Sequence, residues 1–126
     1  MNAPLLTKSF KNAGVAIGAY RIVKFGSADD IAAQASAATD ALMGISNNLG
    51  AAATDTRFDV HLAGVAEVEY GGNVTRGQLL TADSDGKAIV AAPEAGANMR
   101  VIGPAVVSGV SGDIGAAQIA PGQIQG

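Results

Sequence analysis

Polar and apolar residues alternate most regularly between Arg57 and Tyr70. The even positions are apolar or small, whereas the odd positions are mainly polar or charged. This period of two predicts a long β-strand with one face toward a hydrophobic core. A strand of this length usually bends, and Gly64 is the predicted position of the bend.

Shorter apolar segments predict the remaining strands. Residues 78–81 and 87–91 flank the dipeptide Asp85-Gly86, and such a turn between two apolar runs predicts a β-hairpin. Residues 101–107 and 116–119 are predicted to form the last two strands. The segment Asp83-x-Asp85-Gly86 also resembles the start of a calcium loop, but the further oxygen ligands do not follow, which favours a plain turn.

The same order of landmarks occurs twice, 57 to 59 residues apart. Each copy has an apolar pair, an acidic turn, a short apolar run, a Gly-centred segment and an apolar strand that ends near Gly. The first copy contains Ile22-Val23 and Met43-Gly44-Ile45, and the second contains Leu79-Leu80 and Ile102-Gly103-Pro104. The glycines in these segments are interpreted as places where strands approach closely or bulge. We infer two pseudo-repeats of one plan of strands and turns.

The Ala-rich segment between Ile31 and Met43 has helix propensity. The repeat, however, aligns Ile31 with Ile89, which is predicted to lie in a strand. We therefore expect a short strand followed by a turn near residues 37–40. The predicted fold class is all-β, a small β-barrel in which residues 15–126 form a single domain.

Composition narrows the possible chemistry. The 126-residue chain has no Cys and one His, so thiolate and multi-histidine metal sites are not expected. A net charge of −3 argues against a nucleic-acid surface, and no apolar run is long enough to cross a membrane. The N-terminus lacks the pattern of a secretory signal. We expect no cofactor, and the sparse aromatic content favours assembly into oligomers.

Candidate catalytic residues are few. His61 lies on the polar face of the longest predicted strand, and we expect a solvated surface imidazole there. Glu67 and Glu69 share that face and are interpreted as charges that protect a strand edge. Neither a Ser-His-Asp arrangement nor a Gly-x-Ser-x-Gly motif can be assembled, so we do not expect an enzyme.

Residues 20–25 and 37–45 resemble the first half of capsid decoration (cement) proteins of tailed bacteriophages. Residues 77–88 and 100–105 resemble their second half. The resemblance extends from residue 15 to about residue 122 and depends on the order and spacing of the segments. It implies a β-barrel of the β-tulip or SH3-like type.

The resemblance also implies a function. Such proteins bind the major capsid protein on the outer surface of an icosahedral head, at three-fold and quasi-three-fold positions, often as homotrimers. They stabilise the expanded shell. The chain would then be a virion protein made in the host cytoplasm, without catalytic residues.

Residues 1–14 show no clean period and are predicted to form an extended N-terminal arm. We expect this arm to add a strand to a neighbour's sheet, with apolar side chains in pockets and lysines paired with acidic capsid loops. The capsid-binding residues of this hypothesis are Leu5, Leu6, Lys8, Phe10 and Lys11.

Two alternatives stay open. The hairpin Asp83–Ala88 resembles that of lipoyl and biotinyl carrier domains, in which a Lys is modified, and Lys87 would be that residue. A generic β-barrel binding domain is the other alternative.

Overall fold

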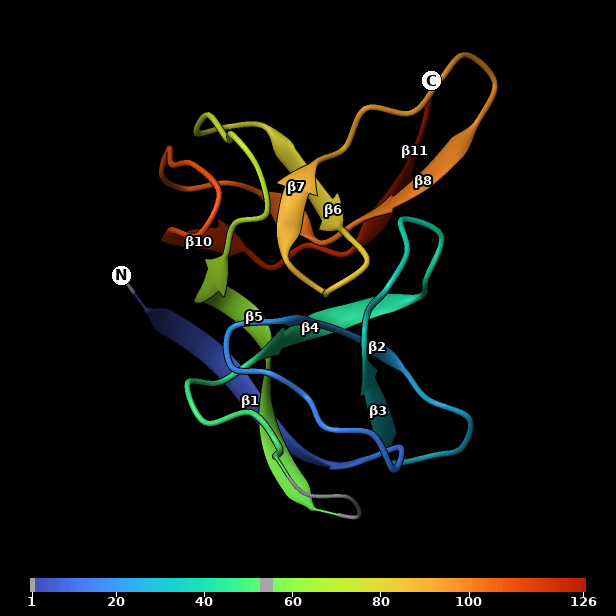
Figure 1. The fold of residues 1–126 in the computed structure, drawn as a ribbon, viewed down its shortest axis with the longest axis vertical. Coiled ribbons are helices and arrows are strands. Elements are labelled where there is room, and N and C mark those ends of the chain that lie inside the picture. The colour runs from blue at the N-terminus through green and yellow to red at the C-terminus, as the bar shows by residue number, and fades with distance from the viewer. Residues whose placement is uncertain (1, 53–55) are drawn as a thin grey trace.

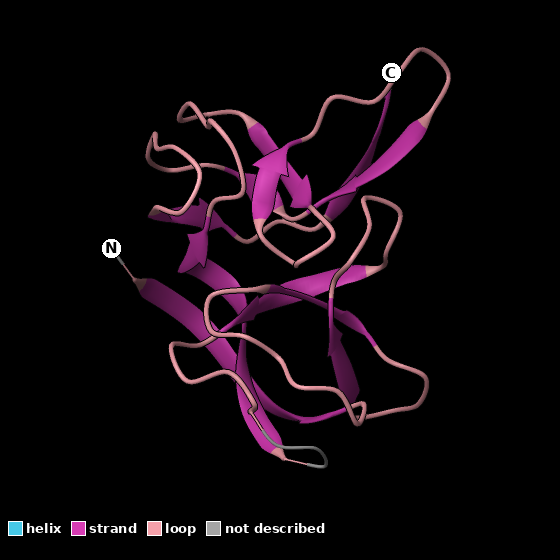
Figure 2. Ribbon diagram, in the orientation of Figure 1, coloured by secondary structure: helices cyan, strands magenta, loops and turns pink. Residues whose placement is uncertain are grey.

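The computed structural model describes residues 2–52 and 56–126. All regular structure in this part of the chain is β, with no helix and therefore none that could cross a membrane (Figure 2). The strands are β1 (Ala3–Asn12), β2 (Ile22–Phe25), β3 (Ile31–Gln34), β4 (Leu42–Ser46), β5 (Arg57–Glu69), β6 (Leu79–Ala82), β7 (Ala88–Val90), β8 (Asn98–Val101), β9 (Gly103–Pro104), β10 (Ile114–Gln118) and β11 (Gly122–Gln125). The predicted all-β class is confirmed.

The first half of the chain forms a circuit of paired strands. The strand β2 lies between β3 and β4 in antiparallel pairings, and β4 pairs antiparallel with the first part of β5. The strand β1 runs antiparallel along β5 and meets β3 in a short parallel pairing, which completes the circuit. The hydrogen bonds of these strands are thus satisfied by neighbours on both sides over much of their length.

The second half repeats this plan around the last part of β5. The strand β6 lies between β7 and β9, and an isolated antiparallel bridge, Ala105↔Ala117, joins the end of β9 to β10. The strand β10 pairs antiparallel with β5, and a parallel bridge, Tyr70↔Ala88, joins the end of β5 to β7. In Figure 1 the strands β1–β4 fill the lower part of the molecule, β6–β11 fill the upper part, and β5 belongs to both.

Two further bridges support the repeat at the level of single residues. In the first half, Ile17 before β2 forms a bridge with Ala51 after β4. In the second half, Val74 before β6 forms the same kind of bridge with Gly109 after β9. Each half also has a turn with a left-handed residue just before its first hairpin, Tyr20 (φ 59°) in one and Gly77 (φ 90°) in the other. The repeat seen in the sequence is therefore a repeat of strand pairing.

Two hydrophobic cores correspond to the two halves. One cluster contains Phe10, Val23, Met43 and Phe58, together with other buried residues of the first half. The larger cluster surrounds Tyr70 in the second half and also includes Ile22, Leu42 and Ile45 from β2 and β4. Because β2 and β4 contribute buried side chains to both clusters, the two halves share a wall.

Glycines at equivalent positions allow strands to approach closely. A Cβ atom on Gly44 would overlap the carbonyl oxygen of His61, and one on Gly103 would overlap that of Gln118. The backbone is the obstacle in both cases, so no side-chain rotation could relieve the overlap. The predicted role of these Gly-centred segments is confirmed.

Most predicted strands are found where the pattern placed them. The strand β5 covers nearly all of the predicted alternation, and Gly64 has φ +89° as expected for a bend. The Ala-rich segment contains β3, a turn and β4, without a helix. The β6–β7 hairpin is also present. The assignment to a β-tulip or SH3-like barrel remains a prediction.

Two regions differ from expectation. The continuous strand predicted over residues 101–107 is broken, because β8 ends at Val101, β9 has only two residues and Gly103 has φ +138°. Pro104 has no N–H to continue the ladder. The sequence also gave no indication of the two-stranded sheet that β11 forms with β8.

We predict that Gly44→Ala and Gly103→Ala each lower the free energy of unfolding by about 2–3 kcal/mol, because the added methyl group must displace a neighbouring strand. Urea denaturation followed by circular dichroism measures this change. Gly122→Ala is the control, since its nearest contact would be Val101 Cγ2 at 3.7 Å, and a change within about 0.5 kcal/mol is expected. Equal losses in all three variants would contradict the close-approach argument.

Candidate functional site

Of the residues 1–14 predicted to form an arm, Ala3–Asn12 form β1, and Met1 lies outside the described residues. The register of β1 runs from Ala3 opposite Val65 to Lys11 opposite Arg57. The segment is extended, as expected, but it is a paired strand of the first half rather than a separate arm. One edge of β1 pairs with β5 of its own chain, whereas the other edge pairs with β3 only at Lys11 and Asn12. Addition of this strand to a neighbour's sheet would therefore use that second edge.

Within β1 the five hypothesised capsid-binding residues divide into exposed and internal groups. Leu5 and Leu6 are 85% and 54% exposed, because the register of β1 against β5 shifts around them and turns consecutive side chains outward. Phe10 is buried in the core, in register with Phe58. The structure thus leaves the two leucines, and not the phenylalanine, available at the surface.

The lysines of β1 lie near charges of the same chain. Lys8 Nζ is 2.9 Å from Asp30 Oδ1 and also lies 4.1 Å from the centre of the Phe10 ring. Arg57 contributes a second cation, 2.9 Å from Asp30 Oδ2. The hydrogen bonds from Lys8 and then Arg57 lower the pKa of Asp30. Lys11 donates its backbone N–H to Asp30 O at 2.9 Å, so this corner holds β1 to the β2–β3 hairpin.

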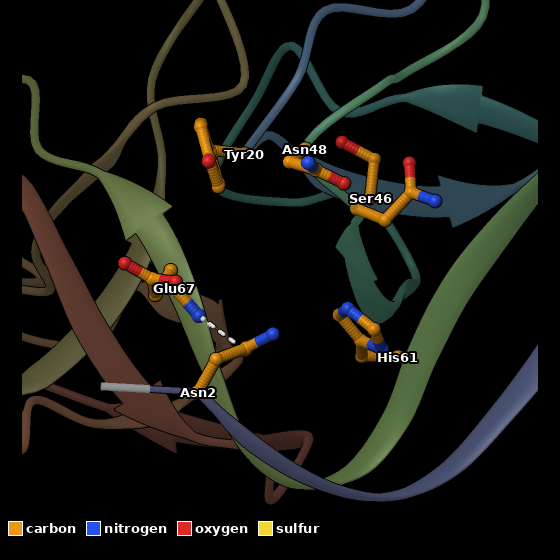
Figure 3. A pocket seen from close by; sticks show the side chains of 7 residues that line it. Asn2, Tyr20, Ser46, Asn48, His61 and Glu67 are labelled. Atoms are coloured by element: carbon orange, nitrogen blue, oxygen red, sulfur yellow. Dashed lines mark hydrogen bonds between the residues drawn. The ribbon is translucent and has the colours of Figure 1, made fainter.

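A polar cleft of about 310 Å³ opens where β5 passes from one half to the other. Polar side chains from five segments surround it: Asn2, Tyr20, Ser46, Asn47, Asn48, His61 and Glu67. In Figure 3, Tyr20, Ser46 and Asn48 lie on one side of the opening, and Asn2 and His61 lie on the other. Asn2 Oδ1 accepts a hydrogen bond from Glu67 N at 3.2 Å, which fixes the start of β1 against β5.

His61 is 9% exposed, so the prediction of a solvated surface imidazole is wrong. His61 is in register with Thr7 of the neighbouring strand β1, and Thr7 Oγ1 lies 2.9 Å from His61 Nδ1. Burial lowers the pKa of His61, while the charge of Asp59 opposes this shift. Burial in the fold therefore favours the neutral form of the imidazole.

Tyr20 has an unusual backbone conformation for a residue with a side chain. Its φ of 59° lies in the left-handed region, which costs a non-glycine residue about 1 kcal/mol or more. Two backbone hydrogen bonds hold it there: Tyr20 N donates to Asn47 O at 3.2 Å, and Glu69 N donates to Tyr20 O at 3.0 Å. The tyrosine is thus fixed at the rim by both β5 and the segment after β4.

Ser46, Asn47 and Asn48, at the end of β4 and just after it, line the cleft together with His61. Ser46 Oγ donates to Gly18 O at 2.8 Å and accepts from Arg21 N at 3.0 Å. Asn47 Oδ1 accepts hydrogen bonds from the backbone of Leu49 and Gly50, at 3.0 and 3.1 Å, and shapes the turn after β4. The cleft therefore has a rigid polar frame that can donate and accept hydrogen bonds. Within the described residues, no group of three His, Cys, Asp or Glu side chains is placed to hold a metal ion.

The hairpin that resembles a carrier domain forms a tight turn. Asp83 Oδ1 accepts hydrogen bonds from Asp85 N and Lys87 N, at 2.8 and 2.9 Å, which confirms the interpretation of this segment as a turn. Lys87 Nζ lies 3.2 Å from Glu69 Oε2 rather than projecting from the tip. This ion pair does not favour a swinging lysine.

The fold is similar to that of a protein from a phage head. The N-terminal base of head fiber gp8.5 of bacteriophage phi29 superposes with a TM-score of 0.60 and 20% sequence identity. The match covers 91% of this chain and 93% of that chain. No protein-family model and no curated protein sequence matches this chain. At this identity the likeness shows a shared fold over nearly the whole of both chains.

The buried His61 predicts a pH dependence of stability. Its folded-state pKa is below the ordinary value of 6.5, so the unfolded chain binds more protons and the free energy of unfolding decreases as the pH is lowered. The contribution is complete above about pH 6.5 and is lost as the pH falls through the folded-state pKa. Urea unfolding at a series of pH values down to about 5, above the range in which carboxylates titrate, measures it.

The control for this measurement is His61→Asn, whose side-chain amide takes the position of Nδ1 beside Thr7 and does not titrate. The variant is expected to lose the dependence on pH between about 7.5 and 5. An equal dependence in both proteins would show that another group is responsible.

Proposed function

We propose that this chain is a structural protein of a tailed-phage head, and specifically a decoration protein on its outer surface. It would bind the major capsid protein, stabilise the expanded shell and act as a homotrimer at three-fold and quasi-three-fold positions. The observation that carries the proposal is the fold shared with the base of the phi29 head fiber over 91% of this chain. The resemblance of residues 15–122 to decoration proteins supports the same role independently.

The exposed leucines of β1 support a contact surface for the shell. Leu5 and Leu6 form a small apolar projection beside the rigid β1–β5 pair. Full burial of a leucine side chain stabilises a complex by about 1.5–3 kcal/mol. A trimer would present this projection three times, and the repeated contact would add avidity.

Electron microscopy of heads tests the proposal. Expanded heads that lack this protein are compared before and after its addition. We expect added density on the outer surface at three-fold and quasi-three-fold positions, and greater resistance of the shell to heat. Heads that gain no density in the presence of excess protein would overturn the proposal. Density at another site would retain head binding and reject the three-fold placement.

Substitution of the exposed leucines tests the contact surface. Deletion of the whole segment would remove β1 from the fold, so we use Leu5→Ser/Leu6→Ser. We expect the affinity for heads to fall at least about tenfold, since each 1.4 kcal/mol of lost contact energy weakens binding tenfold. Quantitative pelleting of protein with expanded heads measures the affinity.

The matched control is Leu49→Ser, because Leu49 is 78% exposed and lies outside β1. It is expected to bind as the unchanged protein does. Circular dichroism verifies that all variants are folded. Unchanged head binding by the double variant would remove Leu5 and Leu6 from the contact surface.

A further inference from the structure

Some residues of the polar cleft are not required by the fold. A comparison of equivalent positions in the two halves shows this. Tyr20 and Gly77 occupy the same turn in the two halves, and both are left-handed. Glycine adopts this conformation without strain, whereas tyrosine does not. The second half therefore forms the same turn without an aromatic side chain, so backbone geometry does not explain Tyr20.

Two other cleft residues also have counterparts in the second half. Asn47 corresponds to Val106, because each lies three residues after the equivalent glycine and their backbone N–H groups donate to Asp59 O and Ala116 O, at 3.2 and 2.8 Å. His61 corresponds to Gln118, because their carbonyl oxygens face the equivalent glycines. The strand pairing is thus compatible with different side chains at these positions. In the first half these residues, together with Tyr20, gather around one opening (Figure 3).

The chemistry of the cleft indicates the class of ligand. Its volume of about 310 Å³ is at the lower end of the range for small-molecule sites. Among the described residues that line it, none is Lys or Arg, which disfavours an anionic ligand, and the predominance of amides and hydroxyls disfavours an apolar one. Amide groups both donate and accept hydrogen bonds, Glu67 supplies acceptors, and the Tyr20 ring supplies a flat apolar face.

We propose that this cleft binds a neutral sugar residue. Each hydroxyl group of a sugar both donates and accepts, which matches the amides of Asn48 and Asn2 and the carboxylate of Glu67. The C–H face of the ring would lie against Tyr20 at the rim. This site is formed by one copy of the chain, so it does not depend on binding to a head.

The test uses the full-length protein and neutral sugars: glucose, galactose, mannose and N-acetylglucosamine. We expect at least one of them to shift the amide resonances of residues 47, 48 and 61 saturably, with a dissociation constant on the order of 1 mM for so small a ligand. Two-dimensional NMR titration measures these shifts. No saturable shift with any of the four at about 50 mM, well above that constant, would overturn the proposal.

Three variants distinguish this site from nonspecific binding. Tyr20→Gly introduces the residue found at the equivalent turn, so we expect a folded protein whose affinity for the sugar falls at least about fivefold. Asn48→Ala is expected to weaken binding similarly. The matched control is Asn98→Ala, which changes an exposed asparagine of β8 outside the cleft and should leave binding unchanged.

The outcomes separate clearly. Loss of binding in Tyr20→Gly and Asn48→Ala, with a native spectrum and retention in Asn98→Ala, supports the site. If all three variants bind the sugar as tightly as the unchanged protein does, the proposed site is wrong. Shifts of the same resonances by inorganic phosphate or calcium, without shifts by any sugar, would assign the cleft to an ion and also overturn the proposal.

Discussion

The structure depends on one strand, β5, whose backbone hydrogen bonds join strands of the first half to a strand of the second. Its first part pairs with β1 and β4, and its last part pairs with β10. Gly64 separates the two parts with a left-handed bend that a Cβ atom would obstruct, because it would meet the backbone of β1. A single covalent segment thereby fixes the relative position of the two halves. The shared wall of β2 and β4 then fills the space between them with apolar side chains.

This arrangement explains why the sequence predicted some strands and not others. The alternation in β5 was visible because its even-numbered positions near both ends are buried, residues 58 and 60 in the core of the first half and residues 66 and 68 in that of the second. In β1, by contrast, only the end beyond Ser9 is buried, and the bulge near Leu5 breaks the period. The strands β8 and β11 are short, largely exposed and paired across a long stretch of chain. The local pattern of apolar and polar residues cannot predict a pairing between two strands that are far apart in the sequence.

The polar cleft was missed for a related reason. His61 lies on the odd-numbered, polar face of β5, where it is the buried exception, and its burial comes from neighbours distant in sequence such as Thr7 of β1. The sequence contained one usable sign, since the turn before the first strand of each repeat has Tyr20 in one copy and Gly77 in the other. Without the backbone angles, however, nothing indicated that this position is left-handed. The structure shows that both residues have a positive φ, so the tyrosine is strained and the glycine is not.

Because the two halves have the same plan of strand pairing, equivalent positions can be compared. Residues that the pairing requires are alike in both halves, and residues with another role differ. Gly44 and Gly103 are both glycines at equivalent positions, where any side chain would collide with a neighbouring backbone. Tyr20 and Gly77 differ although both are left-handed, and the tyrosine keeps a conformation that is costly for it. Replacement by glycine would remove the backbone strain of the folded state but would raise the conformational entropy of the unfolded chain. These two effects oppose each other, so the tyrosine contributes little to the stability of the fold. The first half therefore retains its strained residue at the rim of a polar cleft, where a side chain can meet a ligand. The shared strand-pairing plan is the scaffold, and residues that depart from it are where binding specificity is best sought.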